Sequence, residues 1–245
     1  MASNPIGRCC AVGVKHEGTT TGEEKTIGGV KCYVAYPEDK KTENALIIFT
    51  DIMGYGFNNV RLIADQYAAN GYFTVIPDLF NGNEVDLNQP FDIQKYIAEK
   101  MPRVPTVDPI TTATIKGLRE EYAVKRLGGV GYCFGGKYVI RFLKQGGLDV
   151  GYTAHPSFVD KEEVEGMVGP LSIAAAETDQ IFPAEKRRET EDILQKLEAP
   201  YQMNLFSDVS HGFAVRCDLS KPREKFAKEQ AFLQAVAWFD EYLKA

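Results

Sequence analysis

The sequence contains no apolar run long enough to cross a membrane and no excess of positive charge. Its 245 residues carry a formal net charge of −6, which argues against nucleic acid or an anionic membrane as a partner. The polar residues 1–8 lack the apolar core of a signal peptide, and neither end carries a lipidation or peroxisomal signal. We therefore expect a soluble, cytoplasmic protein.

Cysteine and histidine are also scarce. Five scattered cysteines, an odd number, fit a reducing compartment better than a disulfide framework. Cys9, Cys10 and His16 lie close together in the sequence, but their spacing matches no zinc pattern, and adjacent cysteines rarely bind one ion together. We therefore predict no metal and no cofactor, and we interpret residues 1–24 as a packed or solvent-facing N-terminal arm.

Internal repeats, low-complexity tracts and long linkers are absent as well, so residues 25–245 are predicted to form a single domain. The continuous apolar run 45–50 is typical of a central strand that is buried on both faces. We predict strands over 30–36, 45–50, 72–77, 127–132, 149–154, 171–176 and 201–206, and helices over 58–70, 92–100, 110–122, 137–144, 184–197 and 223–243.

This alternation predicts an α/β fold with a mostly parallel central sheet and helices on both faces. In such folds, active sites lie at the carboxyl ends of the strands. We expect the last helix to pack on the sheet through its apolar side chains, which are Phe226, Phe232, Leu233, Val236, Trp238, Phe239 and Leu243.

The most informative segment is Gly-Tyr-Cys-Phe-Gly at residues 131–135, which has the form of a nucleophile elbow with cysteine in place of the usual serine. An elbow is a tight turn between a strand and a helix, and it needs glycine two positions before and two after the nucleophile. The predicted strand 127–132 and helix 137–144 supply that setting. Cys133 is therefore the candidate nucleophile, and the alternative is a buried core cysteine at the end of a strand.

A nucleophilic thiol needs a base, and the sequence has only three histidines. His16 precedes the first strand, and His155 precedes every plausible acid, whereas this type of site uses the order nucleophile, acid, histidine. His211 follows the last predicted strand and precedes the final helix, so it is the candidate base. We interpret His155 as a packed or hydrogen-bonded loop residue that is dispensable for catalysis.

The acid is expected just after the strand 171–176, where Glu177 and Asp179 enter a loop. Asp179 lies further past the strand end and is the candidate acid, while Glu177 is its competitor and either residue could instead cap the next helix. The oxyanion hole needs two backbone N–H donors. We assign these by position to Phe134, directly after the nucleophile, and to Ile52, after the strand 45–50.

With these segments in place, the sequence resembles the dienelactone hydrolase family of α/β-hydrolases, and its fungal members in particular. The resemblance covers roughly residues 25–243 and implies the α/β-hydrolase fold and a Cys-Asp-His triad at Cys133, Asp179 and His211. It rests on five segments, at residues 50–54, 77–80, 131–136, 176–179 and 211–214.

The resemblance also implies candidate substrate-binding residues, namely Asp51, Phe80, Phe213 and Arg216. Bacterial members of the family have a glutamate, which helps to activate the thiol, where this chain has the shorter Asp51. They also bind the substrate carboxylate with two arginines. Gly82 stands where one of them is expected, and Arg216 is displaced by one residue from the other, so at most half of this anion site is present.

The chemistry of a thiol nucleophile narrows the substrate class. A thiolate leaves a tetrahedral intermediate more easily than an ordinary alkoxide does, so activated esters such as enol lactones, aryl esters and thioesters are favoured. We predict an enzyme of the carboxymethylenebutenolidase type, acting on a small ester or lactone. The alternative is a ligand receptor or cysteine-based redox sensor with low turnover on the same fold.

Overall fold

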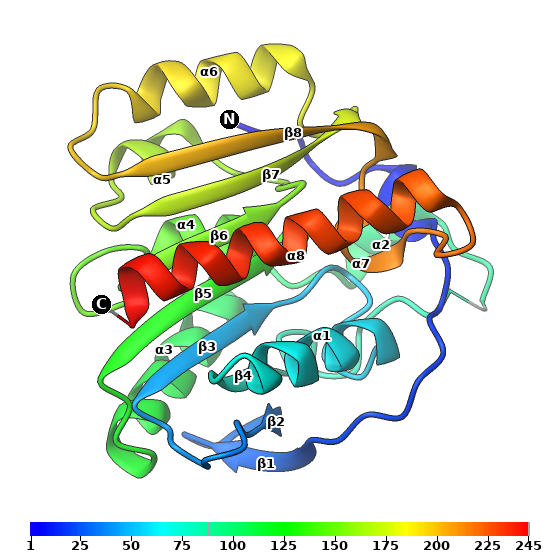
Figure 1. Cartoon of the computed structure of the whole chain (residues 1–245). Coiled ribbons are helices and arrows are strands. Elements are labelled where there is room, and N and C mark those ends of the chain that lie inside the picture. The colour runs from blue at the N-terminus through cyan, green and yellow to red at the C-terminus, as the bar shows by residue number, and fades with distance from the viewer. Residues whose placement is uncertain (88, 245) are drawn as a thin grey trace.

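An eight-stranded sheet forms the centre of the computed structural model, which describes residues 1–87 and 89–244 (Figure 1). The strands lie in the order β1-β2-β4-β3-β5-β6-β7-β8, and the pairs from β4 to β8 are parallel, whereas β1–β2 and β2–β4 are antiparallel. The strands are β1 (Glu23–Ile27), β2 (Val30–Ala35), β3 (Asn44–Phe49), β4 (Phe73–Pro77), β5 (Arg126–Tyr132), β6 (Val150–Ala154), β7 (Leu171–Thr178) and β8 (Tyr201–Ser210). The predicted mostly parallel sheet is confirmed.

Helices cover both faces of this sheet, as expected (Figure 1). One face packs against α1 (Asn58–Ala69), α7 (Phe213–Arg216) and α8 (Pro222–Leu243). The other face packs against α3 (Val104–Glu121), α4 (Phe134–Phe142), α5 (Lys161–Glu165) and α6 (Ala184–Leu194). The remaining helices are α2 (Ile93–Glu99) and the short 3-10 helix η1 (Arg8–Ala11).

Three element boundaries differ from the sequence prediction, and two of them affect the placement of candidate site residues. Helix α3 begins six residues before the predicted start, because Pro105 lies in its first turn, where a backbone N–H has no helical partner anyway. Strand β7 extends to Thr178, so Glu177 belongs to the strand and not to the loop after it. Strand β8 extends to Ser210, which places His211 directly at its end.

The expectation that Phe226 and Leu233 pack on the sheet is wrong, since both are exposed. Helix α8 carries apolar residues around most of its circumference, so its buried face could not be read from hydrophobicity alone. Small residues spaced four apart, Ala227, Ala231 and Ala235, let the helix approach the sheet closely.

Candidate active site

The segment 131–135 forms the strand-turn-helix that the sequence predicts, between β5 and α4. Cys133 has φ 51° and ψ −110°, a conformation that L-residues rarely adopt. A Cβ on Gly131 would lie 2.8 Å from the Gly135 carbonyl oxygen, and a Cβ on Gly135 would overlap the Phe49 carbonyl. The two glycines therefore allow the turn, and the turn places the Cys133 sulfur at the N-terminus of α4.

Asp179 and His211 lie in hydrogen-bond contact at the carboxyl ends of β7 and β8. The His211 Nδ1 is 2.9 Å from Asp179 Oδ2, and both side chains are almost completely buried. The other carboxylate oxygen of Asp179 accepts hydrogen bonds from the backbone N–H groups of Ile181 and Phe182. These contacts fix the carboxylate, which in turn fixes the orientation of the imidazole.

The competing residues lie elsewhere. Glu177 is exposed and accepts a hydrogen bond from the backbone N–H of Asp208, so it does not reach His211 in this arrangement. His16 contacts the Cys217 carbonyl oxygen at 2.8 Å. His155 is fully buried and packs edge-on against the His211 ring with a centroid distance of 4.9 Å. Burial and the neighbouring positive charges hold its pKa well below the ordinary value, so His155 is neutral.

Sequence reasoning missed one neighbour of the nucleophile, Cys10 in the N-terminal arm. Helix η1 places the Cys10 Sγ 3.4 Å from the Cys133 Sγ and 3.4 Å from the His211 Nε2. The hydroxyl of Ser157 lies 3.8 Å from the Cys133 sulfur. The adjacent cysteines of the arm were the only signal in the sequence, and sequence distance gave no reason to place them at the elbow.

The electrostatic setting of Cys133 and His211 favours an ion pair. Burial alone would raise the pKa of Cys133, but the hydrogen bond with Cys10 and the charges of His211 and Arg216 outweigh it and hold the pKa well below its ordinary value. Burial opposes the charge on His211, yet the Cys133 thiolate and Asp179 raise the pKa of His211 to about 10. At neutral pH the pair is therefore a thiolate beside an imidazolium.

Asp51 and Arg216 form a second buried pair next to this one. The Arg216 Nη1 contacts Asp51 Oδ2, its Nε donates to the Val12 carbonyl at 3.1 Å, and the Asp51 Oδ1 accepts from the Met53 N–H. The side chain of Arg216 is buried, and its Nη2 lacks a hydrogen-bond partner among the described residues. Arg216 is therefore a buried residue whose ion-pair partner is Asp51.

The remaining predicted residues lie around the elbow. Phe134 begins α4, so its N–H belongs to the first helical turn, where no carbonyl of the same helix can accept it. Ile52 follows β3 and is buried. The ring of Phe80 packs on Phe134 at a centroid distance of 5.1 Å, and the ring of Phe213 packs against His155 at 5.7 Å.

The arm covers Cys133, whose exposed fraction is 0%. A cleft of about 310 Å³ opens beside it, between Val12, Gly13 and Val14 of the arm and the segment from His211 to Asp218. Cys133 is not among the residues that line this cleft. Solvent therefore reaches the edge of His211 more readily than the Cys133 sulfur.

Three metal-type donors meet here. The sulfur atoms of Cys10 and Cys133 and a ring nitrogen of His211 lie within 4.8 Å of one another, the one group of this kind among the described residues. A closed zinc site takes four protein ligands. The same three atoms are also suited to proton transfer and nucleophilic attack, and we assign no metal to them.

Comparison with known proteins gives consistent results. The model of the dienelactone hydrolase family matches residues 30–243. The hydrolase pyvD of Aspergillus violaceofuscus is 52% identical, over the full length of both chains. Dienlactone hydrolase 1 of Gibberella moniliformis is 35% identical, over 99% of this chain and 96% of its own.

A similar fold is found in the crystal structure of a putative dienelactone hydrolase from Klebsiella pneumoniae. The TM-score is 0.76, with 17% sequence identity, and the match covers 92% of this chain and 100% of that one. In the described part of the chain, no helix combines the length and the apolar character that a bilayer span requires.

Proposed function

The chain belongs to the dienelactone hydrolase family, and from this premise we propose that it hydrolyses activated esters and enol lactones through a thioester on Cys133. Similarity to dienlactone hydrolase 1 and to a carboxymethylenebutenolidase homolog indicates that the chain is a carboxylic-ester hydrolase. The observation that carries the proposal is the placement of the Cys133 sulfur within 4.8 Å of a ring nitrogen of His211, whose Nδ1 is held by Asp179 at 2.9 Å. Nucleophile, base and orienting acid thus converge from three strand ends.

In the first half of the reaction, the Cys133 thiolate attacks the carbonyl carbon and forms a carbon–sulfur bond, while the carbonyl oxygen takes the electron pair. The N–H groups of Ile52 and Phe134 stabilise that oxyanion. When the intermediate collapses, the carbon–oxygen bond to the leaving group breaks, and the His211 imidazolium donates its proton to the leaving oxygen.

In the second half, His211 accepts a proton from water, and the resulting hydroxide attacks the thioester carbon. The carbon–sulfur bond breaks, so the acid product leaves and the thiolate–imidazolium pair is restored. Asp179 keeps the imidazole oriented throughout. Because the thiolate is a good leaving group, the first half proceeds forward best when the leaving group is an enolate, a phenolate or a thiolate.

We assign the substrate side of the pocket to Asp51, Phe80, Phe213 and Arg216. The unpartnered Nη2 of buried Arg216 supports a contact with an anionic substrate group. Asp51 is occupied by Arg216 and by the Met53 N–H, so its effect on the thiol acts mainly by holding Arg216 in place. Phe80 and Phe213 supply apolar walls.

The decisive experiment replaces the nucleophile. Cys133→Ala is expected to lower kcat for an aryl acetate by several orders of magnitude, as the loss of a triad nucleophile usually does. Cys32→Ala and Cys217→Ala remove buried thiols away from the elbow and serve as matched controls with nearly full activity. Activity of Cys133→Ala above about a tenth of wild type would contradict the assignment. No turnover by the wild type would favour the alternative of a receptor or redox sensor.

A further inference from the structure

The arm does more than cover the candidate nucleophile, because its Cys10 contacts both charged partners. The Cys10 Sγ is 3.4 Å from the Cys133 Sγ and 3.4 Å from the His211 Nε2, and the three groups form a triangle. All three side chains are buried, so bulk water does not compete for these hydrogen bonds. A thiol can donate through its S–H and accept through its sulfur at the same time.

The position of Cys10 is enforced from both ends of the arm. Before η1, the N–H of Ser3 donates to the Val159 carbonyl and its hydroxyl accepts from the Val159 N–H. After η1, the N–H of Val14 donates to the Arg216 carbonyl, and the Arg216 Nε donates to the Val12 carbonyl. Both ends are therefore fastened to segments next to the elbow.

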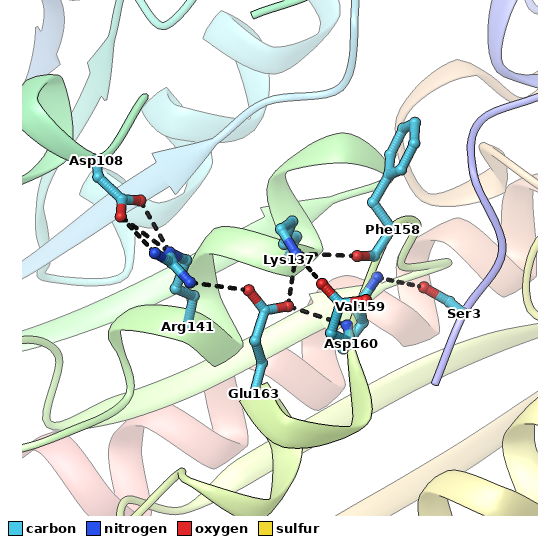
Figure 2. A network of polar contacts seen from close by, with 8 residues as sticks. All are labelled: Ser3, Asp108, Lys137, Arg141, Phe158, Val159, Asp160 and Glu163. Carbon is cyan, nitrogen blue, oxygen red and sulfur yellow. Dashed lines mark hydrogen bonds and ion pairs between the residues drawn. The ribbon is translucent and has the colours of Figure 1, made fainter. Parts of the chain in front are cut away.

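Figure 2 shows that the loop that contacts Ser3, residues 158–160, is itself hydrogen-bonded to α4, the helix that follows Cys133. Lys137, one turn after Cys133 in α4, donates to the Phe158 carbonyl at 3.1 Å and to the carboxylates of Asp160 and Glu163, each at 2.8 Å. The segment that holds Ser3 is thus fastened to the helix that follows Cys133. These hydrogen bonds hold the arm in a defined position relative to Cys133.

We propose that Cys10 is a positioning residue of the reaction, whose thiol bridges the His211 imidazolium and the Cys133 thiolate. The imidazolium Nε2–H donates to the Cys10 sulfur. The contact between the two sulfur atoms meets hydrogen-bond geometry with Cys133 as the donor, and once Cys133 is a thiolate, the Cys10 S–H rotates to donate to it. This inference rests on the proposed function, because it assigns Cys10 a part in holding that nucleophile ready. The elbow motif itself does not imply a thiol from the arm.

The protonation states of the three groups agree with this bridge. Cys10 has a pKa above the ordinary value, chiefly through its hydrogen bond to Cys133, so it remains a neutral donor. Several other titratable groups influence Cys133 or His211, and any measurement has to separate Cys10 from them; they are Cys9, Asp51, Tyr96, His155, Asp179 and Arg216.

The test measures the titration of the Cys133 thiolate directly, by its ultraviolet absorbance. Each protein is titrated beside the same protein carrying Cys133→Ala, and the difference belongs to Cys133. Both are kept with a reductant, because two sulfur atoms this close can join on oxidation, and with a chelator. The proteins compared are wild type, Cys10→Ala, Cys10→Ser and the matched control Cys32→Ala.

For Cys10→Ala we expect the ratio of Cys133 thiolate to thiol, at a pH in its titration range, to fall at least about tenfold, the effect of losing one hydrogen bond to a charged group. Cys10→Ser keeps a donor of similar size and should restore most of that loss, and Cys32→Ala should match wild type. If Cys10 only filled space, serine would have no reason to restore the titration of Cys133 that alanine shifts.

Two results would overturn the proposal. One is an unchanged titration in both Cys10→Ala and Cys10→Ser. The other is a Cys10→Ala shift that serine does not restore although Cys10→Ser melts like wild type, which would assign the effect to packing. Since the readout needs no substrate, a failure of the hydrolase assignment is recognised separately, by turnover that survives Cys133→Ala.

Discussion

Among single residues, the buried pair of Cys133 and His211 sets the pH response. The raised pKa of His211, about 10 against an ordinary 6.5, gives stability that is complete below pH 6.5 and is lost as the pH rises through about 10. The lowered pKa of Cys133 gives stability that is present above its ordinary 9.0 and is lost as the pH falls through the lowered value. Together these contributions predict a plateau between pH 6.5 and 9.0.

We therefore expect the melting temperature of the wild type to fall as the pH rises from 9.0 to about 10, because the folded state there holds a His211 proton that the unfolded state has already released, and Cys133 no longer offsets this loss. The measurement is thermal unfolding followed by circular dichroism across this range. His211→Gln lacks the titrating group and is the control. An equally steep alkaline decline in that variant would show that other groups cause it.

Arg216 and Asp51 give a second prediction on this scale. Removing one partner of a buried ion pair leaves an uncompensated charge, so Arg216→Met should lower the free energy of unfolding by about 3–5 kcal/mol. Replacing both partners, as Asp51→Asn with Arg216→Met, should cost much less. Urea unfolding of the two single variants and the double variant measures the coupling, and additive losses would contradict a direct interaction.

The same double variant tests whether Arg216 recognises an anion. Its kcat/KM for a carboxylated enol lactone should fall by a factor that corresponds to roughly 1.5–3 kcal/mol of activation free energy relative to wild type. Its kcat/KM for the methyl ester should change little. Equal losses on both substrates, or none on either, would remove Arg216 from the substrate site.

Among the elements, the elbow depends on the close approach of α4 to β3. A Cβ on Gly135 would overlap the Phe49 carbonyl, which is backbone of a central strand and cannot move aside. Gly135→Ala should therefore destabilise the protein by at least about 1–3 kcal/mol, even though alanine favours a helix by up to about 1 kcal/mol. Gly56→Ala meets nothing within 4 Å and is the control, with an expected change within about 0.5 kcal/mol. Equal melting temperatures of the two variants would contradict this packing.

Element prediction from the sequence worked where one physical signal dominates. Continuous apolar runs identified β3 and β4, and the apolar stripe of α1 ended where expected, near Gly71. Local sequence pattern does not indicate elements that form through tertiary contacts. Strand β1 has four exposed residues and no apolar pattern, and it exists because it pairs with β2. Helix α8 could not be oriented, since exposed and buried apolar residues share it.

For the whole molecule, chain order is more informative than local pattern. Strands β5, β7 and β8 run parallel in one sheet, so the segments that follow them meet at one edge. The order of the candidate residues along the chain was therefore enough to predict that Asp179 contacts His211. The contact of Cys10 with this edge follows from a path of the arm that no periodicity encodes. The burial of Arg216 against Asp51 likewise depends on segments that are 165 residues apart.

The central claim, a thioester on Cys133, is tested most directly by trapping it. An aryl ester or enol lactone is mixed with wild-type protein, quenched in acid within the first turnover, digested and analysed by mass spectrometry. We predict the acyl group on the peptide that contains Cys133, and its loss on longer incubation as water releases the product. An acyl group on Cys9, Cys10 or a serine, with Cys133 unmodified while turnover proceeds, would contradict the account.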